Sequence, residues 1–308
     1  MGRIFEALQK VEQGKNIERK EDSSSSKLTH EDLVLDSKLV SFFEPSSLAA
    51  EQFKRLRTHI LRPSLDNPPK TILVTSAMAG EGKSLTAINL AITIAIELHS
   101  NALIVDCDLR NPSLSRWFGF REERGLSNYL LGEAEIQELL IKTSVDKLSI
   151  LPGGTLQDNT VELIGSNKMK SLIMDLKARY PDRYIIFDSS PLLATTEPSV
   201  LNEMVDGILL VVKSAETPRE SVQLALKMLD KKKILGMVLN KQEFKTEALI
   251  RRYFGTNRYY DNYYQTEMHP VLTNWQKFKY SKLFFANLRP KNKDGYKSKD
   301  GHSEKAFL

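Results

Sequence analysis

The stretch TILVTSAMAGEGKSLTAINLA, residues 71–91, limits the possible folds of this 308-residue chain more than any other. An apolar run typical of a β-strand ends at Ser76, a loop of small residues follows, and Lys83 opens a helical stretch. Gly80 and Gly82 would let backbone N–H groups point inward around phosphate oxygens. The N-terminus of the helix adds a partial positive charge. This order of strand, loop and helix predicts a phosphate-binding P-loop.

Two side chains of this loop are predicted to act on a nucleotide. Lys83 can reach the β- and γ-phosphates, and the Ser84 hydroxyl can bind Mg²⁺. Glu81 has no predicted role of its own and is interpreted as a solvated residue of the loop. The alternative is a glycine-rich turn with an unrelated lysine. The predicted nucleotide-binding residues are Ala79, Gly80, Glu81, Gly82, Lys83, Ser84 and Leu85.

Short apolar runs alternate with helical stretches through the body of the chain. Most of these runs are continuous, as expected for parallel strands that are buried on both faces. The predicted fold class is therefore α/β, with a P-loop NTPase-like parallel sheet flanked by helices on both faces. The predicted strands are 71–75, 102–106, 148–151, 184–188, 207–212 and 236–240.

Carboxylates follow two of these predicted strands. Asp106 and Asp108 end the second strand, and their spacing places both on the same side of an extended chain. Asp188 ends the fourth strand, at the usual position of a Walker B carboxylate. Ligands of open α/β sheets bind at such strand ends, so one carboxylate could accept a proton while another holds Mg²⁺. The alternative is a pair of polar turns, and Cys107 is interpreted as a packing residue.

The net charge of +5 is unevenly distributed. Residues 251–308 hold 12 Lys/Arg and 5 Asp/Glu, so this segment carries +7 and the remainder carries −2. The same segment holds seven of the ten tyrosines. We predict a flexible, basic, tyrosine-rich tail that could contact anionic lipid or bind nucleic acid without specificity.

The chain divides into four predicted segments. Residues 1–13 form an amphipathic helix, which either docks on a partner or a membrane or packs on its own domain. Residues 14–30 form a polar linker, 31–250 the P-loop domain and 251–308 the tail. No stretch approaches the roughly 20 apolar residues that span a bilayer, and no signal-peptide pattern is present. We therefore expect a cytoplasmic protein.

Three motifs together resemble a known family. The segments AMAGEGKS (77–84), LIVDCDLR (103–110) and IIFDSSP (185–191) resemble the Walker A, Walker A′ and Walker B motifs of bacterial tyrosine kinases of exopolysaccharide and capsule synthesis. LPGG at 151–154 and NTVELIGSNKM at 159–169 are also similar to segments of that family. The resemblance extends over roughly residues 45–264.

The resemblance implies ATP-dependent phosphorylation of tyrosines, chiefly in the C-terminal cluster of a neighbouring subunit. It implies that Lys83 and Ser84 bind ATP and Mg²⁺, that Asp106 accepts the proton of the tyrosine hydroxyl, and that Asp108 and Asp188 organise Mg²⁺. Asn240 resembles a residue that contacts adenine in related ATPases, although asparagine is also common in turns. The implied autophosphorylation sites are Tyr253, Tyr259, Tyr260, Tyr263 and Tyr264.

One departure concerns the contact between subunits. The family pattern is a glutamate followed by arginines three and six residues later, whereas this chain has Glu51, Lys54 and Arg57. Lysine cannot form the bidentate fork of arginine, so the ring-like oligomer of the family is in question. The alternative is a solvated charged helix face. Ala79 also stands where the family often has proline.

The implied partners are a membrane-embedded activator on a separate chain, other copies of this chain and a cognate phosphotyrosine phosphatase. Recruitment to the inner face of the cell membrane is expected, and specific nucleic-acid binding is not. A positioning ATPase of the MinD/ParA type is the leading alternative, but such proteins usually carry another lysine early in the P-loop and residues 76–79 contain none. A nucleotide-binding adaptor is the third hypothesis.

Overall fold

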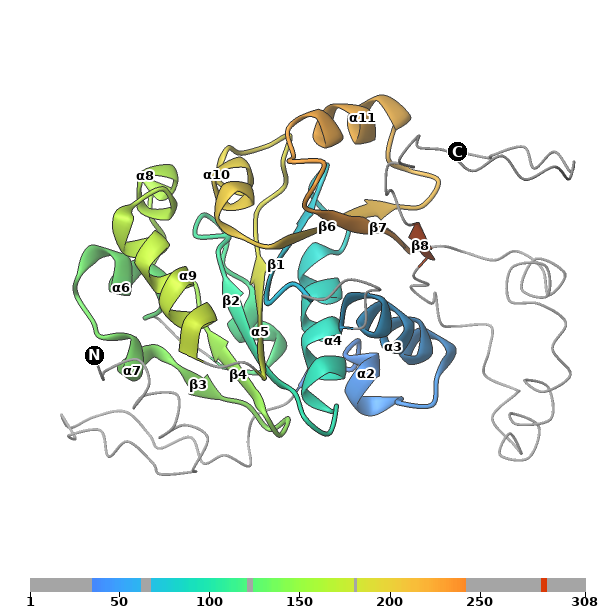
Figure 1. Ribbon diagram of the computed structural model, residues 1–308, viewed down its shortest axis with the longest axis horizontal. Coiled ribbons are helices and arrows are strands. Elements are labelled where there is room, and N and C mark those ends of the chain that lie inside the picture. Colours follow the sequence, from blue (N-terminus) through green and yellow to red (C-terminus); the bar gives the residue numbers. More distant parts are fainter. Residues whose placement is uncertain (1–34, 62–67, 121–123, 180–181, 242–283, 287–308) are drawn as a thin grey trace, which may run out of the picture.

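The computed structural model describes residues 35–61, 68–120, 124–179, 182–241 and 284–286 (Figure 1). The predicted N-terminal helix, the linker and the five tyrosines of the implied phosphorylation cluster lie outside these residues. The four predicted segment boundaries therefore stay predictions.

The described residues form a sheet of eight strands in the order β3-β4-β2-β5-β1-β6-β7-β8. The six strands from β4 to β7 in this order run parallel to one another, as predicted. The strands are β1 (Thr71–Ser76), β2 (Asn101–Asp106), β3 (Ile141–Lys142), β4 (Leu148–Leu151), β5 (Arg183–Asp188), β6 (Gly207–Lys213), β7 (Ile234–Asn240) and β8 (Phe284–Ala286).

The two edges of the sheet were not predicted. β3 pairs antiparallel with β4, and β8 pairs antiparallel with β7. β3 has only two residues, which is too few to show an apolar run, and β8 belongs to the segment that was predicted to be a flexible tail. The sheet is therefore mixed, with a parallel centre and antiparallel edges.

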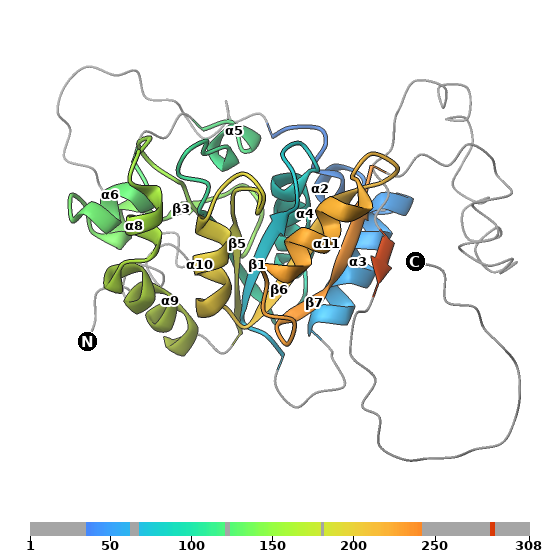
Figure 2. The same cartoon turned by 90° about the horizontal axis from the view of Figure 1, so that it is seen from above.

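Helices cover both faces of this sheet, as predicted (Figures 1 and 2). They are α2 (Val40–Phe43), α3 (Leu48–Leu61), α4 (Lys83–Ala95), α5 (Leu114–Trp117), α6 (Leu126–Leu131), α7 (Ile136–Leu139), α8 (Thr160–Ile164), α9 (Asn167–Arg179), α10 (Glu197–Met204) and α11 (Arg219–Lys227). Among the described helices, none is long and apolar enough to cross a bilayer.

Alternate residues of each central strand enter different hydrophobic cores, because successive side chains of a strand point to opposite faces. In β1, Ile72 and Val74 pack with α3 and α4, whereas Leu73 packs with α6, α8, α9 and α10. Burial on both faces explains why these strands read as continuous apolar runs. α4 lies deep in the first core, and ten of its residues, 86–95, are buried.

Candidate active site

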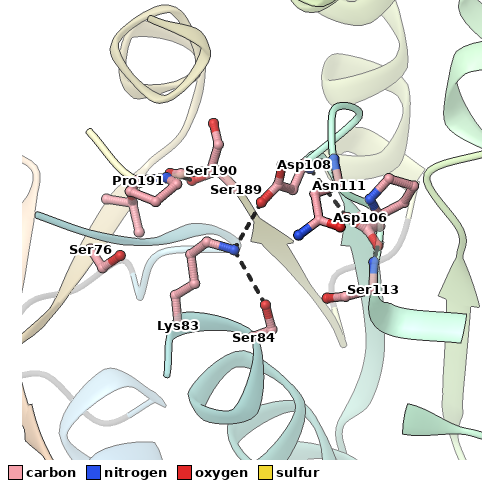
Figure 3. Close-up of polar contacts among 12 residues, drawn as sticks. Ser76, Lys83, Ser84, Asp106, Asp108, Asn111, Ser113, Ser189, Ser190 and Pro191 are labelled. Carbon is pink, nitrogen blue, oxygen red and sulfur yellow. Dashed lines mark hydrogen bonds and ion pairs between the residues drawn. The ribbon is translucent and has the colours of Figure 1, made fainter. Parts of the chain in front are cut away.

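The predicted catalytic carboxylates and the P-loop meet at the carboxyl ends of three adjacent strands, β2, β5 and β1. Asp106 ends β2 and pairs directly with Asp188, which ends β5. The P-loop leaves the end of β1 and enters α4 at Lys83. Figure 3 shows Lys83 reaching from the start of α4 toward these strand ends. Parallel strands deliver their last residues to one edge of a sheet, so residues far apart in sequence become neighbours.

Two glycines give the P-loop its shape. Gly80 and Gly82 have φ values of +79° and +92°, in a region that residues with a Cβ atom rarely adopt. A Cβ atom on Gly82 would lie 2.1 Å from Asn240 Nδ2, whereas one on Gly80 would meet nothing within 4 Å. The turn into α4 therefore requires glycine at residue 82 for both backbone and steric reasons.

Lys83 is held by acceptors on both sides. Its Nζ atom lies 3.0 Å from Asp108 Oδ2 and 3.4 Å from Ser84 Oγ (Figure 3). Burial alone would lower the pKa of the ammonium group, but Asp188 and Asp108 outweigh this effect and raise the pKa above its ordinary value. Lys83 therefore stays fully charged at neutral pH.

Asp106 is completely buried and bound by three backbone donors. Its Oδ2 atom accepts hydrogen bonds from the N–H groups of Ser113 at 2.8 Å and Leu114 at 3.0 Å, and its Oδ1 atom accepts one from Asp108 N at 3.2 Å. Burial, followed by repulsion from Asp188, raises the pKa of Asp106 despite these bonds. A carboxylate with a raised pKa is a better proton acceptor than an ordinary aspartate.

Asp188 is the carboxylate whose surroundings are incomplete. Both of its oxygens are buried, and neither has a hydrogen-bond partner among the described residues. Burial raises its pKa, and the nearby charge of Lys83 and the nearby Ser84 hydroxyl only partly offset this. A buried carboxylate without a well-formed hydrogen bond is unfavourable unless a further cation or donor completes the site.

Mg²⁺ fits this set of donors. Asp188, Asp108 and the Ser84 hydroxyl supply the hard oxygen atoms that the ion prefers. The part of the chain that the structure describes holds no cluster of three or more side chains that could form a metal cage. This agrees with the usual Mg²⁺ site at a nucleotide, where one or two carboxylates act together with phosphate oxygens and water.

The interpretation of Glu81 as a solvated residue was wrong. Its side chain is only 2% exposed, and its Oε2 atom accepts a hydrogen bond from Met78 N at 2.7 Å. Its Oε1 atom accepts hydrogen bonds from Lys213 N at 3.3 Å and from the Thr217 hydroxyl. The two donors to Oε1 come from more than 130 residues away, so no local sequence signal predicted this burial.

Asn240 lies beside the P-loop, at the end of β7. Its Nδ2 atom donates to Glu81 O at 2.8 Å, and its Oδ1 atom accepts a hydrogen bond from Lys241 N at 2.8 Å. Lys241 Nζ in turn donates to Gly80 O at 2.9 Å. Asn240 therefore contacts the loop itself, and its contact with adenine stays a prediction. The role of Lys241 was not anticipated.

A second polar cluster joins the loop after β2 to α8 and α10. Arg110 Nε lies 2.8 Å from Glu197 Oε1 and 3.1 Å from Thr160 Oγ1, and the Thr160 hydroxyl donates to the same carboxylate oxygen. Burial would raise the pKa of Glu197, but these hydrogen bonds lower it to about 2. The cluster holds the segment after Asp108 in place, and sequence reasoning missed it.

Cys107 packs in the hydrophobic core below the site, as predicted. It is fully buried, and burial raises the pKa of its thiol well above the ordinary value. The thiol therefore stays protonated and takes no part in the polar network of the site.

The predicted subunit-contact residues lie on α3. Lys54 Nζ is 3.5 Å from Glu51 Oε2 on the same helix. Arg57 turns toward α4, where its Nη1 atom donates to Thr93 O at 2.9 Å, and its Nε atom is 3.0 Å from Oε2 of Glu97, just beyond the end of that helix. Arg57 thus holds α3 against α4 within one chain, and the contact between subunits stays a prediction.

Comparison with known proteins identifies the family of this chain. The AAA domain family matches residues 69–249. The tyrosine-protein kinase YwqD of Bacillus subtilis (strain 168) is 33% identical over 229 residues, which are 74% of this chain and 94% of that protein. The chain belongs to the bacterial tyrosine-protein kinases. The tyrosine-protein kinase CpsD of Streptococcus pneumoniae is 32% identical to this kinase over 197 residues, covering 63% and 83% of the two chains.

Solved structures agree with this membership. The crystal structure of the chimerical protein CapA2B2 matches with a TM-score of 0.64 at 29% identity and covers 70% of this kinase and all of that chain. The kinase domain of the Escherichia coli tyrosine kinase ETK matches with a TM-score of 0.60 and covers 74% and 85%. At 22% identity, the second match shows the fold alone.

Proposed function

We propose that this kinase transfers the γ-phosphate of ATP to tyrosine hydroxyls. The observation that carries the proposal is the convergence of Lys83, Asp106, Asp108 and Asp188 on one sheet edge beside a preformed P-loop. The named tyrosine-protein kinases that resemble the chain support the same reaction. Phosphoryl transfer depends on positioning and charge neutralisation, which this group of residues supplies.

Lys83 and the P-loop N–H groups bind the phosphates. To reach the β- and γ-phosphates, the Lys83 ammonium exchanges its contact with Asp108 for phosphate oxygens. Asp108 is thereby freed from its ion pair with Lys83. Ser84, Asp108 and Asp188 would hold Mg²⁺, which would supply positive charge to neutralise the charge that develops on the phosphates.

Asp106 accepts the proton of the attacking tyrosine. The hydroxyl group of tyrosine has a pKa near 10, so its proton must leave as the new bond forms. Three backbone N–H groups fix the orientation of the Asp106 carboxylate, and a carboxylate has about four acceptor positions, so one remains for the hydroxyl. The raised pKa of Asp106 favours this transfer.

The acceptors are tyrosines of the C-terminal cluster, phosphorylated in trans between copies of the chain. Each phosphate adds about −1.5 to −2 charges, so modification of several tyrosines would remove the +7 of residues 251–308. The loss of positive charge weakens contact with acidic surfaces and loosens self-association. The acceptor residues are Tyr253, Tyr259, Tyr260, Tyr263 and Tyr264.

The cellular role follows from the family. We place the kinase in the cytoplasm, recruited to the inner face of the cell membrane by an activator on a separate chain. There it regulates the polymerisation or export of an exopolysaccharide or capsule, and a phosphotyrosine phosphatase reverses its modification. Relatives named putative tyrosine-protein kinase CapB and tyrosine-protein kinase CpsD support the assignment as a kinase.

A mixing experiment tests both the reaction and its direction. Wild-type protein and a tagged Lys83→Met chain are incubated together with labelled ATP and Mg²⁺, and phosphate is mapped by mass spectrometry. We expect phosphotyrosine on the tagged chain within residues 251–308 only when wild type is present. Lys170→Met, an exposed position on α9, is the matched control and should retain activity. ATP-dependent binding of DNA or lipid without any phosphotyrosine would favour a positioning ATPase instead.

A further inference from the structure

The P-loop is held by side chains that lie on the far side of β1 from the catalytic carboxylates. In the sheet order, β2 and β5 lie on one side of β1, and β6 and β7 lie on the other. The carbonyl of Gly80 accepts a hydrogen bond from Lys241, and the carbonyl of Glu81 accepts one from Asn240. Both carbonyls therefore point toward the end of β7 and away from Asp106 and Asp188.

These two contacts also determine where the loop's N–H groups point. In a trans peptide the C=O of one residue and the N–H of the next point in opposite directions. The Gly80 carbonyl points toward Lys241, so the N–H of Glu81 points away from β7. The Glu81 carbonyl points toward Asn240, so the N–H of Gly82 also points away from β7. Those N–H groups thus face the side on which phosphate must lie to meet Lys83 and the carboxylates.

The Glu81 carboxylate closes the loop from the same side. It accepts hydrogen bonds from the N–H of Met78 within the loop, from the N–H of Lys213 at the end of β6, and from the Thr217 hydroxyl in the turn that follows β6. Ser76 Oγ donates to Met78 O at 2.8 Å and closes the first part of the loop as well. The loop is therefore anchored to the ends of both β6 and β7.

We propose that Glu81 is a positioning residue for the nucleotide, whose carboxylate ties the P-loop to the β6–α11 turn and so holds the loop in its phosphate-binding arrangement before ATP arrives. This inference rests on the proposed function, because it presumes that the loop binds ATP. Preorganisation of this kind improves affinity by removing the cost of ordering the loop on binding. Glu81 itself does not need to touch the phosphates.

Two substitutions test the role of the carboxylate. Glu81→Gln keeps the shape of the side chain but replaces one carboxylate oxygen by an NH₂ group. This NH₂ group is a donor, and it would face the N–H and O–H groups that donate to Glu81 in the wild type. Thr217→Val removes the hydroxyl donor from the other end of the contact, and Thr217→Ser restores it. The measurements are the Kd of MgADP by calorimetry, and the KM for ATP and kcat with a tyrosine acceptor.

We expect Glu81→Gln and Thr217→Val to raise both the Kd of MgADP and the KM for ATP by about tenfold, with kcat within about twofold of wild type. Thr217→Ser should bind like wild type. Hydrogen exchange of residues 77–82 should be faster in Glu81→Gln without nucleotide, and the difference should shrink with MgADP bound. Glu216→Gln is the matched control, because Glu216 lies in the same turn as Thr217 and its carboxylate pairs with Lys213 Nζ and not with the loop.

Other outcomes would overturn the inference. An unchanged Kd and KM in both Glu81→Gln and Thr217→Val would show that the loop does not depend on the contact. A lower melting temperature and lower kcat with unchanged Kd would show a purely structural role. If Glu81→Gln does not fold, Thr217→Val decides alone. Wild-type protein that binds no nucleotide would overturn the proposed function, and this inference with it.

Discussion

Lys83 and Asp108 form an ion pair across the entrance of the P-loop, with Nζ and Oδ2 3.0 Å apart and both side chains largely buried. In the proposed mechanism, the Lys83 ammonium binds phosphate and the Asp108 carboxylate binds Mg²⁺, yet in this structure the two groups are paired with each other. We therefore expect ATP binding to separate the pair, so that Lys83 exchanges Asp108 for phosphate oxygens.

The exchange predicts opposite effects of Asp108→Asn on binding and on catalysis. Without Mg²⁺, the variant should bind ADP about as tightly as wild type or up to about tenfold more tightly, because Lys83 no longer leaves a charged partner. The phosphorylation rate should fall by about 100-fold or more, since a metal ligand is lost. Calorimetry and a phosphotyrosine assay measure the two effects. Asp146→Asn, at an exposed turn, is the control, and weaker ADP binding by Asp108→Asn would contradict the exchange.

Gly82 and Gly80 should respond differently to the same substitution. Gly82→Ala combines a positive φ with a Cβ atom that would lie 2.1 Å from Asn240 Nδ2, so we expect about 1–3 kcal/mol of destabilisation and the loss of nucleotide binding. Gly80→Ala has the positive φ without the clash, so its free energy of unfolding should fall by only about 1 kcal/mol. Chemical denaturation and ADP titration distinguish them. Equal effects would show that Asn240 moves aside freely.

Glu197 should stabilise the folded kinase down to acid pH. Its folded pKa of about 2 lies below the value of about 4.3 expected in the unfolded chain. Its contribution is therefore fully present above about pH 4.3 and is lost as pH falls toward 2. Glu197→Gln should lower the free energy of unfolding by about 1–3 kcal/mol at pH 7, and the difference from wild type should shrink on acidification.

Denaturation of wild type and Glu197→Gln between pH 7 and pH 2 checks this behaviour. Glu203→Gln is the matched control, because Glu203 is an exposed glutamate of the same helix α10. A stability difference that does not depend on pH would assign the effect to packing and not to the charge of Glu197.

Asp188 should lower the stability of the nucleotide-free protein. Its folded pKa is raised mainly by burial, so the folded state holds its proton more tightly than the unfolded state, whose aspartates titrate near 3.9. Stability therefore falls as pH rises through and above that value. Asp188→Asn should remove this dependence and raise the unfolding free energy at pH 7 by about 1–2 kcal/mol, while abolishing phosphorylation.

Thermal denaturation across pH 4–8, with and without MgADP, measures this effect. MgADP should stabilise wild type by mass action and should stabilise Asp188→Asn far less. A variant that is less stable than wild type at pH 7 would show that the carboxylate has a donor partner in the folded protein.

The sheet and the position of the site were predictable for a physical reason. Parallel strands buried on both faces are apolar throughout, so the strands from β1 to β7, except β3, appear as continuous apolar runs. Once these strands are parallel, their last residues must share one edge, which brings Asp106 and Asp188 together with the loop of Lys83. The P-loop depends on local spacing alone, and local spacing is visible in a sequence.

Contacts between distant segments could not be read in this way. Arg110 and Glu197 are 87 residues apart, and Glu81 and Thr217 are 136 apart. Nothing in the neighbouring residues of Glu81 distinguishes a buried carboxylate from a solvated one, since the donors to its Oε1 atom come from the end of β6 and the turn that follows it. The same limit applies to Arg57. The family resemblance implied a subunit contact for this residue, and the structure shows that it also joins α3 to α4 within the chain.

The amino-acid sequence by itself therefore determined the fold class, the phosphate-binding loop and the identity of the charged residues that gather around it, because these follow from local periodicity and spacing. Only the tertiary structure decided how those charges are balanced: Lys83 against Asp108, Asp188 without a hydrogen-bond partner among the described residues, and Glu81 buried beneath the loop. Burial and hydrogen-bond partners set the pKa and the orientation of a side chain, and both depend on segments that the chain brings together only when it folds.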